Sequence, residues 1–208
     1  MLCALLFLVF SVSFAGQKAV TDTGELVILN DDGTWTYENT AKSGQDLTKI
    51  STNKTQFRKP ESSVFQLKSK ATNLGLWINP KKWKFAEKGS LSPAAEFELK
   101  HDNLDIYGLV ITETIEIKLE NLADIAFENA QSAGENAKVV TKEYRVVNGT
   151  KVIYMETDAL VSGIQATYLG YYYSDTKGSN QILVFTGTSM VKKYESEIFD
   201  MLNGFVVR

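Results

Sequence analysis

Hydrophobic and polar positions alternate along much of the second half of the chain. In residues 94–101 (AAEFELKH), Ala95, Phe97 and Leu99 fall on one side, and the charged residues between them fall on the other. This period-two pattern is typical of a β-strand with one buried and one exposed face. The stretch 105–118 (DIYGLVITETIEIK) is less polar on both faces at its centre and predicts a longer β run.

Two segments place their apolar residues at helical spacing instead. Residues 120–134 (ENLADIAFENAQSAG) predict a helix that ends at Gly134, with two acids near its start that suit the helix dipole. Near the end of the chain, residues 191–202 predict a second helix, followed by a short apolar run at 205–207. Its apolar stripe consists of Val191, Tyr194, Ile198, Met201 and Leu202. Each stripe needs a sheet to cover it.

Glycine-containing turns separate the strand-like runs. Asn148-Gly149 and the segment 175–180 each predict a β-hairpin. In NDDGTWTYEN (30–39), Asp32-Gly33 predicts a further hairpin, so its two acids are interpreted as turn residues. A calcium loop would need liganding oxygens over about twelve residues and a closing glutamate, which this stretch lacks.

Strand pairs, one helix, further strands and a terminal helix make an α+β layout. This order, together with LGLWINPKKWKF (74–85) and IFDMLNGFVV (198–207), resembles the fold shared by the PsbP family of extrinsic photosystem II proteins and the Ran-binding proteins of the Mog type. The resemblance covers roughly residues 61–208. It implies an antiparallel sheet flanked by helices, and a binding or assembly role in place of catalysis.

The N-terminal part has its own β pattern, with strand-like runs at 18–21, 25–30 and 34–38. The Val/Leu run followed by DGTW-x-Y resembles the short SH3-like β segment found near the N-terminus of many bacterial envelope proteins. About two dozen residues are too few to fold alone. We expect this segment to pack on the larger domain or to pair with a partner.

Charge divides the chain into parts. Residues 16–40, the SH3-like β segment, carry one lysine against five acids, whereas residues 41–60 carry five cations against one acid. Because residues 41–60 are rich in Ser, Thr, Lys and Gln and lack periodic apolar positions, they are interpreted as a linker. Residues 61–208 are the PsbP/Mog-like α+β domain.

The chain opens on MLCALLFLVFSVSFAG, an apolar run followed by small and polar residues. Residues 1–15 are interpreted as a signal peptide, with Ser13 and Ala15 at the spacing of a cleavage site before Gly16. The expected location is a bacterial periplasm or the cell exterior, with no membrane span after cleavage. Since no Lys or Arg precedes the apolar run, a retained membrane anchor is the alternative. Cys3 lies in this segment, so the mature chain has no thiol for a disulfide, a metal site or a nucleophile.

The overall composition limits the kinds of partner that the protein is expected to bind. A formal charge of -3 and a pI near 5.3 give no basic face for nucleic acid, so that partner is excluded. The hydrophobic share of 44% is ordinary for a packed globular protein. No phosphate loop or dinucleotide fingerprint occurs. We therefore expect no cofactor and no metal, and the sequence names neither a ligand nor an oligomeric state.

Reactive groups are few. His101 is the only histidine, and its neighbour Asp102 points to the opposite face of a strand, so the pair is no catalytic dyad and His101 is expected to be a surface turn residue. No G-x-S-x-G elbow appears. The 25 acids occur throughout the chain, and no pair of them stands out as a glycosidase site.

Aromatic residues are the better candidates for binding. Alternation sends Tyr171 and Tyr173 to one face of a strand and Tyr172 to the other, while Trp77 and Trp83 flank the turn Asn79-Pro80. Tyrosine and tryptophan clusters favour interfaces. The candidate binding residues are Trp77, Trp83, Tyr171 and Tyr173, with packing in the core as the alternative interpretation.

These patterns favour an exported, non-enzymatic binding or assembly protein whose partner is an envelope protein or a small ligand. One alternative is a carboxylate-based hydrolase, which requires at least two acids facing one cleft. Another is a structural factor held at the membrane by residues 1–15.

Overall fold

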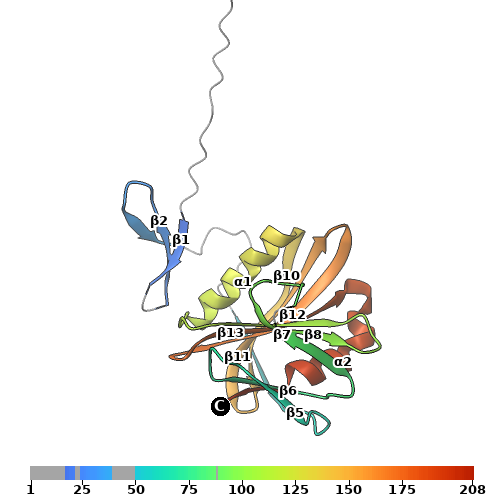
Figure 1. The fold of residues 1–208 in the computed structure, drawn as a ribbon. Helices are drawn as coiled ribbons and strands as arrows, with labels where there is room; N and C mark the ends of the chain where they lie inside the picture. The colour runs from blue at the N-terminus through green and yellow to red at the C-terminus, as the bar shows by residue number, and fades with distance from the viewer. Residues whose placement is uncertain (1–16, 22–23, 39–49, 88) are drawn as a thin grey trace, which may run out of the picture.

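The computed structural model describes residues 17–21, 24–38, 50–87 and 89–208. The expected signal peptide lies outside these residues. The described chain has the α+β layout that the patterns predicted, with three sheets and two α-helices (Figure 1).

An eight-stranded sheet forms the body of the molecule. From one edge to the other, its strands are β4 (Ser51–Phe57), β10 (Glu135–Val147), β11 (Thr150–Val161), β12 (Ile164–Asp175), β13 (Gly178–Gly187), β9 (Tyr107–Glu113), β8 (Ala95–His101) and β7 (Trp83–Glu87). The described strands pair antiparallel except for β4, which runs parallel to β10.

Two three-stranded antiparallel sheets complete the β structure. One has the order β14-β6-β5 and the other the order β1-β2-β3. Their strands are β5 (Phe65–Lys68), β6 (Leu74–Ile78), β14 (Phe205–Val207), β1 (Gln17–Val20), β2 (Leu26–Leu29) and β3 (Trp35–Tyr37). The helices are α1 (Leu119–Ala133) and α2 (Val191–Leu202), the latter preceded by the 3-10 turn η2 (Thr188–Met190).

The turns follow the residues that favour them. Asn148 and Gly149 have φ values of 49° and 85°, so the two-residue turn between β10 and β11 forms where the sequence predicts it. Between β2 and β3, Gly33 has a φ of 81°, and a carboxylate oxygen of Asp32 accepts bonds from the backbone N–H and the hydroxyl of Thr34, at 2.9 and 2.6 Å. This part of the chain is a hairpin turn.

The two helices cover opposite faces of the large sheet. In Figure 1, α1 lies above the sheet, and α2 lies below it with β5 and β6. Tyr172 belongs to the apolar cluster under α1, whereas Tyr171 and Tyr173 lie on the α2 side, as alternation predicted. The stripe of α2 is buried at Tyr194, Ile198, Met201 and Leu202. The sheet therefore has a core on each face.

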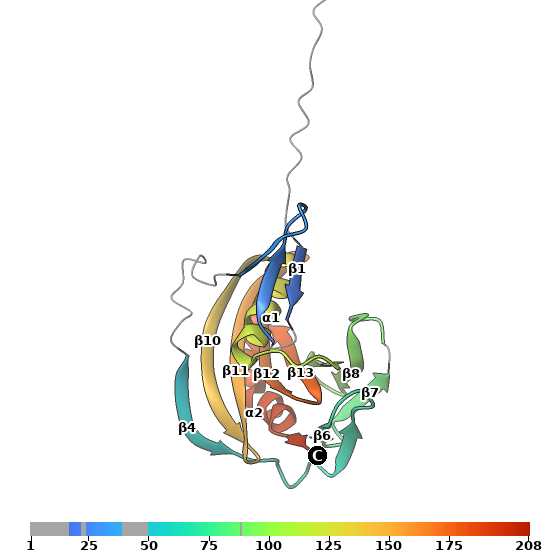
Figure 2. The ribbon, with the colours of Figure 1, turned by 90° about the vertical axis from the view of Figure 1, so that its left-hand side faces the viewer.

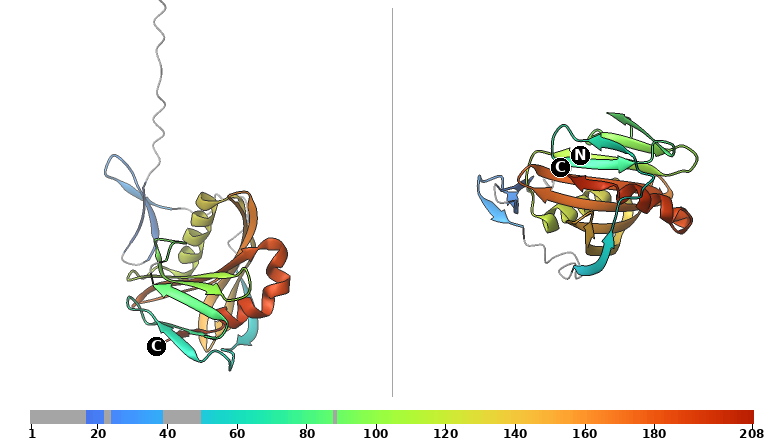
Figure 3. Two further views of the ribbon diagram at one scale, coloured as in Figure 1. Left: turned by 45° about the vertical axis from the view of Figure 1, so that its right-hand side comes forward. Right: turned by 90° about the horizontal axis from the view of Figure 1, so that it is seen from below.

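Strand β4 corrects the expected linker at 41–60. Residues 51–57 are a strand at the outer edge of the large sheet, far from β5 and β6 (Figures 2 and 3). Its register places Ser51 opposite Glu143 and Phe57 opposite Val147. The linker prediction is wrong for this segment. Backbone pairing with β10 makes it a strand, although it has no apolar face that the sequence could reveal. Residues 39–49 lie outside the described residues.

The long β run expected at 105–118 is shorter than the pattern suggested. Strand β9 ends at Glu113, which pairs with Ser179 at the beginning of β13, so residues beyond it have no strand to pair with. Strand β8 also differs in one detail. Glu98, on the face expected to be exposed, is buried because its carboxylate accepts the backbone N–H groups of Leu91 and Ser92 at 2.6 and 2.8 Å.

The small N-terminal sheet rests on α1 (Figure 2). The carbonyl oxygen of Gly24 accepts bonds from the backbone N–H of Lys118, at 3.1 Å, and from the side chain of Asn121, at 2.9 Å. Lys18 forms an ion pair of 2.5 Å with Glu128. These contacts tie β1–β3 to the larger domain. Three short antiparallel strands stand where the β segment was expected, and their SH3-like relationship stays a prediction.

Candidate functional site

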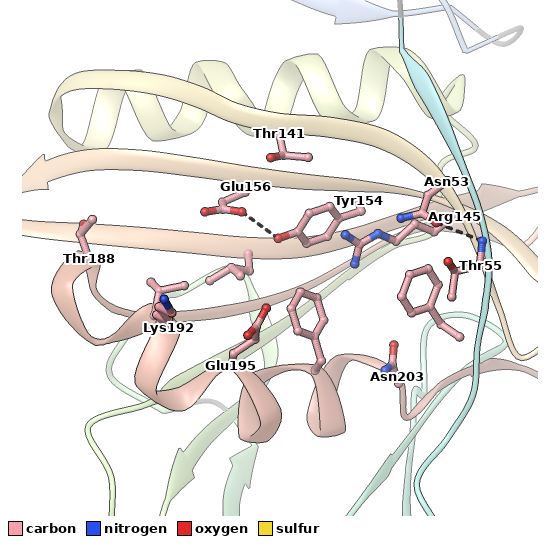
Figure 4. A pocket seen from close by; sticks show the side chains of 14 residues that line it. Asn53, Thr55, Thr141, Arg145, Tyr154, Glu156, Thr188, Lys192, Glu195 and Asn203 are labelled. Atoms are coloured by element: carbon pink, nitrogen blue, oxygen red, sulfur yellow. Dashed lines mark hydrogen bonds between the residues drawn. The ribbon is translucent and has the colours of Figure 1, made fainter.

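A cavity of about 830 Å³ lies between α2 and the outer strands of the large sheet (Figure 4). We name it the α2 groove. It is lined by Asn53, Thr55, Phe57, Thr141, Arg145, Tyr154, Glu156, Leu169, Thr188, Val191, Lys192, Glu195, Phe199 and Asn203. Its size falls within the range of roughly 300–1,000 Å³ that is common for small-molecule sites.

The position of α2 explains the cavity. The helix packs on β12, β13 and β6, toward the middle of the molecule. Strands β4, β10 and β11 extend the sheet beyond the helix, and their inward side chains form the floor and outer wall of the groove. The groove thus results from a sheet that is wider than the helix that covers it.

Arg145 is the central charged residue of the α2 groove. It lies two residues before Val147, which is fully buried, so alternation turns both side chains to the α2 side of the sheet. Only 8% of Arg145 is exposed. Its guanidinium carbon lies 3.5 Å from the ring centroid of Tyr154, 4.7 Å from that of Phe57 and 5.2 Å from that of Phe199. Three rings thus surround a cation, an arrangement that favours the charged group.

The hydrogen bonds of Arg145 are incomplete. Its Nε donates to Oε1 of Glu143 at 2.7 Å, and the same oxygen accepts from the side-chain amide of Asn53 at 3.0 Å. Nη1 is buried and has no hydrogen-bond partner among the described residues. A buried donor left unpaired costs about 1–3 kcal/mol, and more when it is charged. This nitrogen is therefore a donor ready for a ligand.

Two tyrosine hydroxyls help to order the groove. Tyr154 donates to Oε2 of Glu156 at 3.0 Å, and Tyr171 donates to Oδ1 of Asn203 at 2.8 Å. Burial raises the pKa of both phenols above the usual value, while the nearby Arg145 opposes the rise. The two tyrosines are therefore neutral hydrogen-bond donors at neutral pH and do not act as bases.

The rim of the groove carries both positive and negative side chains. Lys192 and Glu195 project from the exposed side of α2, and Glu156 lies on β11 (Figure 4). With Arg145, the lining has two cations and two acids. Two carboxylates therefore face the same cleft.

The four sequence-predicted binding residues lie outside the lining of the α2 groove. Trp83 and Tyr171 are 3% and 1% exposed and belong to the core. Trp77 and Tyr173 are half-buried, and the Lys59 ammonium lies 5.3 Å from the Trp77 ring centroid. Tyr171 contacts the lining through its bond to Asn203 and through the ring of Tyr154, with 6.0 Å between the two ring centroids. A binding role for the four stays a prediction.

His101 is buried, so its expected place in a surface turn is wrong. It is 5% exposed and packs edge-on against Trp83, with 5.2 Å between the ring centroids. Along β8, His101 follows Phe97 and Leu99 at every second position, so its side chain points into the core as theirs do. Its Nδ1 accepts the N–H of Asn103, and its Nε2 lies 3.7 Å from the nearer oxygen of Glu197, beyond hydrogen-bond distance.

Asp102, the neighbour of His101, pairs with Lys84 at 3.2 Å and not with the imidazole. Over the described ranges, no group of three or more His, Cys, Asp or Glu side chains is arranged to hold a metal ion. None of the helices in the described part of the chain is long and apolar enough to cross a membrane.

Sequence reasoning did not single out Arg145, Tyr154 or Phe199. A signal for the first was present: Arg145 lies at the same strand parity as Val147, on the side that alternation assigns to the core. A charged residue at an inward position of a strand marks either an ion pair or a binding site. Phe199 lies on α2, and no local sequence pattern connects it to Arg145 on β10.

Comparison with known proteins identifies the fold alone. Neither protein-family models nor the sequences of curated proteins gave a match. Among solved structures, the chain is similar to cyanobacterial PsbP from Synechocystis sp. PCC 6803, with a TM-score of 0.55, 14% identity, and coverage of 71% of this chain and 94% of that one. The fold is therefore PsbP-like.

Two further structures are more distant. One is a Pseudomonas aeruginosa protein of unknown function described as a putative regulator, with a TM-score of 0.45 and 9% identity over 69% of this chain and 96% of that chain. The other is a Bacteroides thetaiotaomicron protein, with a TM-score of 0.41 and 11% identity over 69% of this chain and 48% of that chain.

Proposed function

We propose that the protein is an exported, non-enzymatic binding or assembly protein whose ligand or partner segment occupies the α2 groove. The observation that carries the proposal is the groove itself, a cavity of about 830 Å³ with a mixed polar and aromatic lining. Pockets of this kind combine apolar contact area with a few polar groups that orient the ligand. Four strands of one sheet, β4, β10, β11 and β12, contribute to its lining, so the site is largely formed before a ligand arrives.

The chemistry of the lining favours binding over catalysis. The lining residues, which all belong to the described part of the chain, include no histidine and no cysteine. The Tyr154 phenol is held neutral by burial, with its hydroxyl committed to Glu156. Binding thus asks less of these side chains than proton transfer or nucleophilic attack does.

Export is the second part of the proposal, and it rests on the apolar opening of the sequence at residues 1–15. Mass spectrometry of the native N-terminus tests it directly. A chain that begins at Gly16 supports an exported protein released from its signal. A chain that retains residues 1–15 and stays with the membrane fraction supports the anchored structural factor.

A groove-filling variant with a matched control tests the site. Thr141 and Val140 are neighbours on β10: Thr141 lines the groove, whereas Val140 is 49% exposed. We expect Thr141→Trp to abolish binding of groove ligands and Val140→Trp to leave it unchanged. Ligands come from an NMR fragment screen of the chain from residue 16, read as shifts clustered on the groove residues. Equal binding to both variants would contradict the proposal.

One observation favours a carboxylate-based hydrolase as a second candidate, because Glu156 and Glu195 line the same groove. Two carboxylates can share the work of acid and base across a scissile bond. The test is to incubate each groove ligand with the protein and to follow its mass. Turnover that disappears in both Glu156→Gln and Glu195→Gln supports the hydrolase, and an unchanged ligand mass supports the binding protein.

A further inference from the structure

The unpaired nitrogen of Arg145 indicates which chemistry the α2 groove recognises. The side chain is more than nine-tenths buried, and Nη1 has no hydrogen-bond partner anywhere in the described residues. Figure 4 shows the guanidinium reaching from β10 into the space between Tyr154 and α2. A charged donor in this position calls for an acceptor from outside the chain, because leaving it unpaired is costly.

The surroundings hold this donor in place before any ligand binds. Nε is fixed by Glu143 at 2.7 Å, and the guanidinium carbon lies 3.5 Å from the ring centroid of Tyr154. Phe57 and Phe199 close two more sides. An arginine fixed in this way loses little conformational freedom on binding, so more of the interaction appears as affinity.

The neighbouring charges select a monoanion. Glu143 already shares the guanidinium of Arg145, and Glu156 lies on the adjacent strand β11. A dianion such as a phosphate monoester would place a second negative charge beside these acids, which Coulomb repulsion opposes. A carboxylate brings one negative charge and two acceptor oxygens, and it forms a charge-assisted bond to the free N–H groups.

The rest of the lining selects the body of the ligand. The rings of Phe57 and Phe199 lie 4.7 and 5.2 Å from the guanidinium carbon of Arg145, and Leu169 and Val191 add apolar side chains to the lining. In Figure 4, Glu156 and Glu195 lie between Arg145 and the far end of the groove at Thr188 and Lys192, so the apolar contacts for a ligand body are those next to the guanidinium. Burial of apolar ligand surface there stabilises the complex by roughly 25 cal/mol per Å².

We infer that the α2 groove binds a monocarboxylate with an apolar body, and that its carboxylate is held by Nη1 of Arg145. This inference rests on the proposed function and names its ligand class. The same chemistry occurs in two sources, a free aliphatic or aromatic acid and the C-terminal carboxylate of a peptide ending in an apolar residue. The experiment separates them.

The first experiment compares acids with their amides on the chain from residue 16. The probes are decanoate and 4-phenylbutyrate with their primary amides, and a hexapeptide ending in leucine with a free or an amidated C-terminus. NMR titration gives each dissociation constant. We expect each binding acid to bind at least about ten-fold more tightly than its amide, since the amide lacks the charge that strengthens the bond. Binding of decanoate or 4-phenylbutyrate identifies a free acid as the ligand, and binding of the hexapeptide with a free C-terminus identifies a peptide.

Two variants assign the effect to one side chain. Arg145→Gln removes the buried cation, and Lys193→Gln removes an exposed cation of α2 outside the groove lining as a matched control. We expect the preference for acid over amide to disappear in Arg145→Gln and to persist in Lys193→Gln. Equal loss in both variants would mean general electrostatic attraction and would overturn the assignment to Arg145.

A measurement on the unmodified side chain covers the case in which Arg145→Gln does not fold. In protein labelled with ¹⁵N-arginine, the Arg145 guanidinium resonances are expected to shift with the acid and to stay in place with the amide. If acid and amide bind in the groove equally well, the inference fails while the proposed function stands. If no probe and no screened fragment perturbs the groove residues, both fail.

Discussion

The two faces of the large sheet are closed in different ways, and neighbouring residues of one strand show the difference. On the α1 face, the Tyr144 hydroxyl donates to Glu120. The Lys142 side chain, which is 7% exposed, also lies on this side, with its ammonium 2.5 Å from Asp124. On the α2 face, Arg145 keeps Nη1 without a partner in the described chain. One strand thus carries satisfied polar groups toward one helix and an unsatisfied one toward the other.

The cause lies in the helices. Helix α1 places Glu120 and Asp124 four residues apart, on the side that meets β10, and each acid reaches one polar side chain of the strand. Helix α2 packs further along the sheet, on β12, β13 and β6, and it meets Arg145 of β10 with the ring of Phe199, which offers the guanidinium no acceptor oxygen. The comparison teaches that in this fold an open polar site arises where the covering helix packs on the middle of the sheet and not on the outer strands. The following variants test that difference, from the largest expected effect to the smallest.

The helices themselves should be equally well anchored. Leu122 of α1 and Ile198 of α2 are 1% and 0% exposed. We expect Leu122→Ala and Ile198→Ala each to lower the free energy of unfolding by about 2–5 kcal/mol, because each leaves a cavity in a packed core. Urea denaturation measures both, with the exposed Ser196→Ala as control. A loss at Ile198 far below that at Leu122 would make α2 a loose lid and not a wall of the groove.

The Arg145–Glu143 pair should depend on both of its members. We expect Arg145→Met to lower the free energy of unfolding by roughly 1–3 kcal/mol, because Glu143 then loses its cation. The double variant Glu143→Gln, Arg145→Met should recover part of this loss, since the neutral amide still accepts the bond from Asn53. Chemical denaturation of the two single variants and the double variant gives the coupling. Strict additivity would mean that the pair is not coupled.

Alanine substitutions at two glycines distinguish loss of docking of the N-terminal sheet from the effect of backbone strain alone. Gly24 and Gly33 both have positive φ, at 77° and 81°. A Cβ on Gly24 would lie 2.7 Å from the backbone nitrogen of Lys118, whereas one on Gly33 would meet no atom within 4 Å. Each alanine adds about 1–2 kcal/mol of strain, and only Gly24→Ala should also free β1–β3 from α1. Hydrogen exchange of β2 measures this, and equal exchange in both variants would show that docking does not need Gly24.

The smallest effect concerns pH on the α1 face. Burial disfavours ionised Glu120, but the hydrogen bond from Tyr144 and a backbone bond outweigh it, so the pKa of Glu120 lies below its usual value of 4.5. A lowered pKa adds stability above pH 4.5, and this stability is lost as the pH falls through the folded-state pKa. We expect Glu120→Gln to flatten the acid limb of the stability profile by roughly 0.2–1 kcal/mol.

The contact between Tyr144 and Glu120 also makes stability depend on pH in the alkaline range. Burial, together with the hydrogen bond to Glu120, raises the pKa of Tyr144 from 10.0 to about 12. Its contribution is therefore complete below pH 10.0 and is lost as the pH rises toward 12. Urea titrations at several pH values, with Tyr144→Phe as the matched control, measure both limbs. A variant profile parallel to that of the unmodified protein on both limbs would contradict the role of this contact.

Local patterns predicted much of the fold and little of the site. The alternation around Phe97, the Asn148-Gly149 turn and the apolar stripe of α2 all depend on neighbours in sequence, so one sequence is enough to find them. Strand β4 was missed because STNKTQF has no apolar alternation, and pairing with a distant strand defines it.

The site depends on contacts between distant segments. Arginine is mostly an exposed residue, so only the strand parity that Arg145 shares with Val147 pointed to its burial. It is buried because Phe57 arrives from β4 and Phe199 from α2 to cover its charge, while Glu143 neutralises it from the same strand. Composition along β10 cannot supply the first two of these partners, so the groove had no signature in the local pattern.

The parallel pairing of β4 with β10 also sets an order of events during synthesis. Asn53 and Glu143, which join the two strands, are separated by 90 residues. The ribosome therefore releases β4 long before its partner exists, and the strand waits unpaired while the intervening chain emerges. The groove therefore cannot be complete until the chain as far as α2, at Val191–Leu202, has been synthesised, because β10 and α2 supply the walls that face β4.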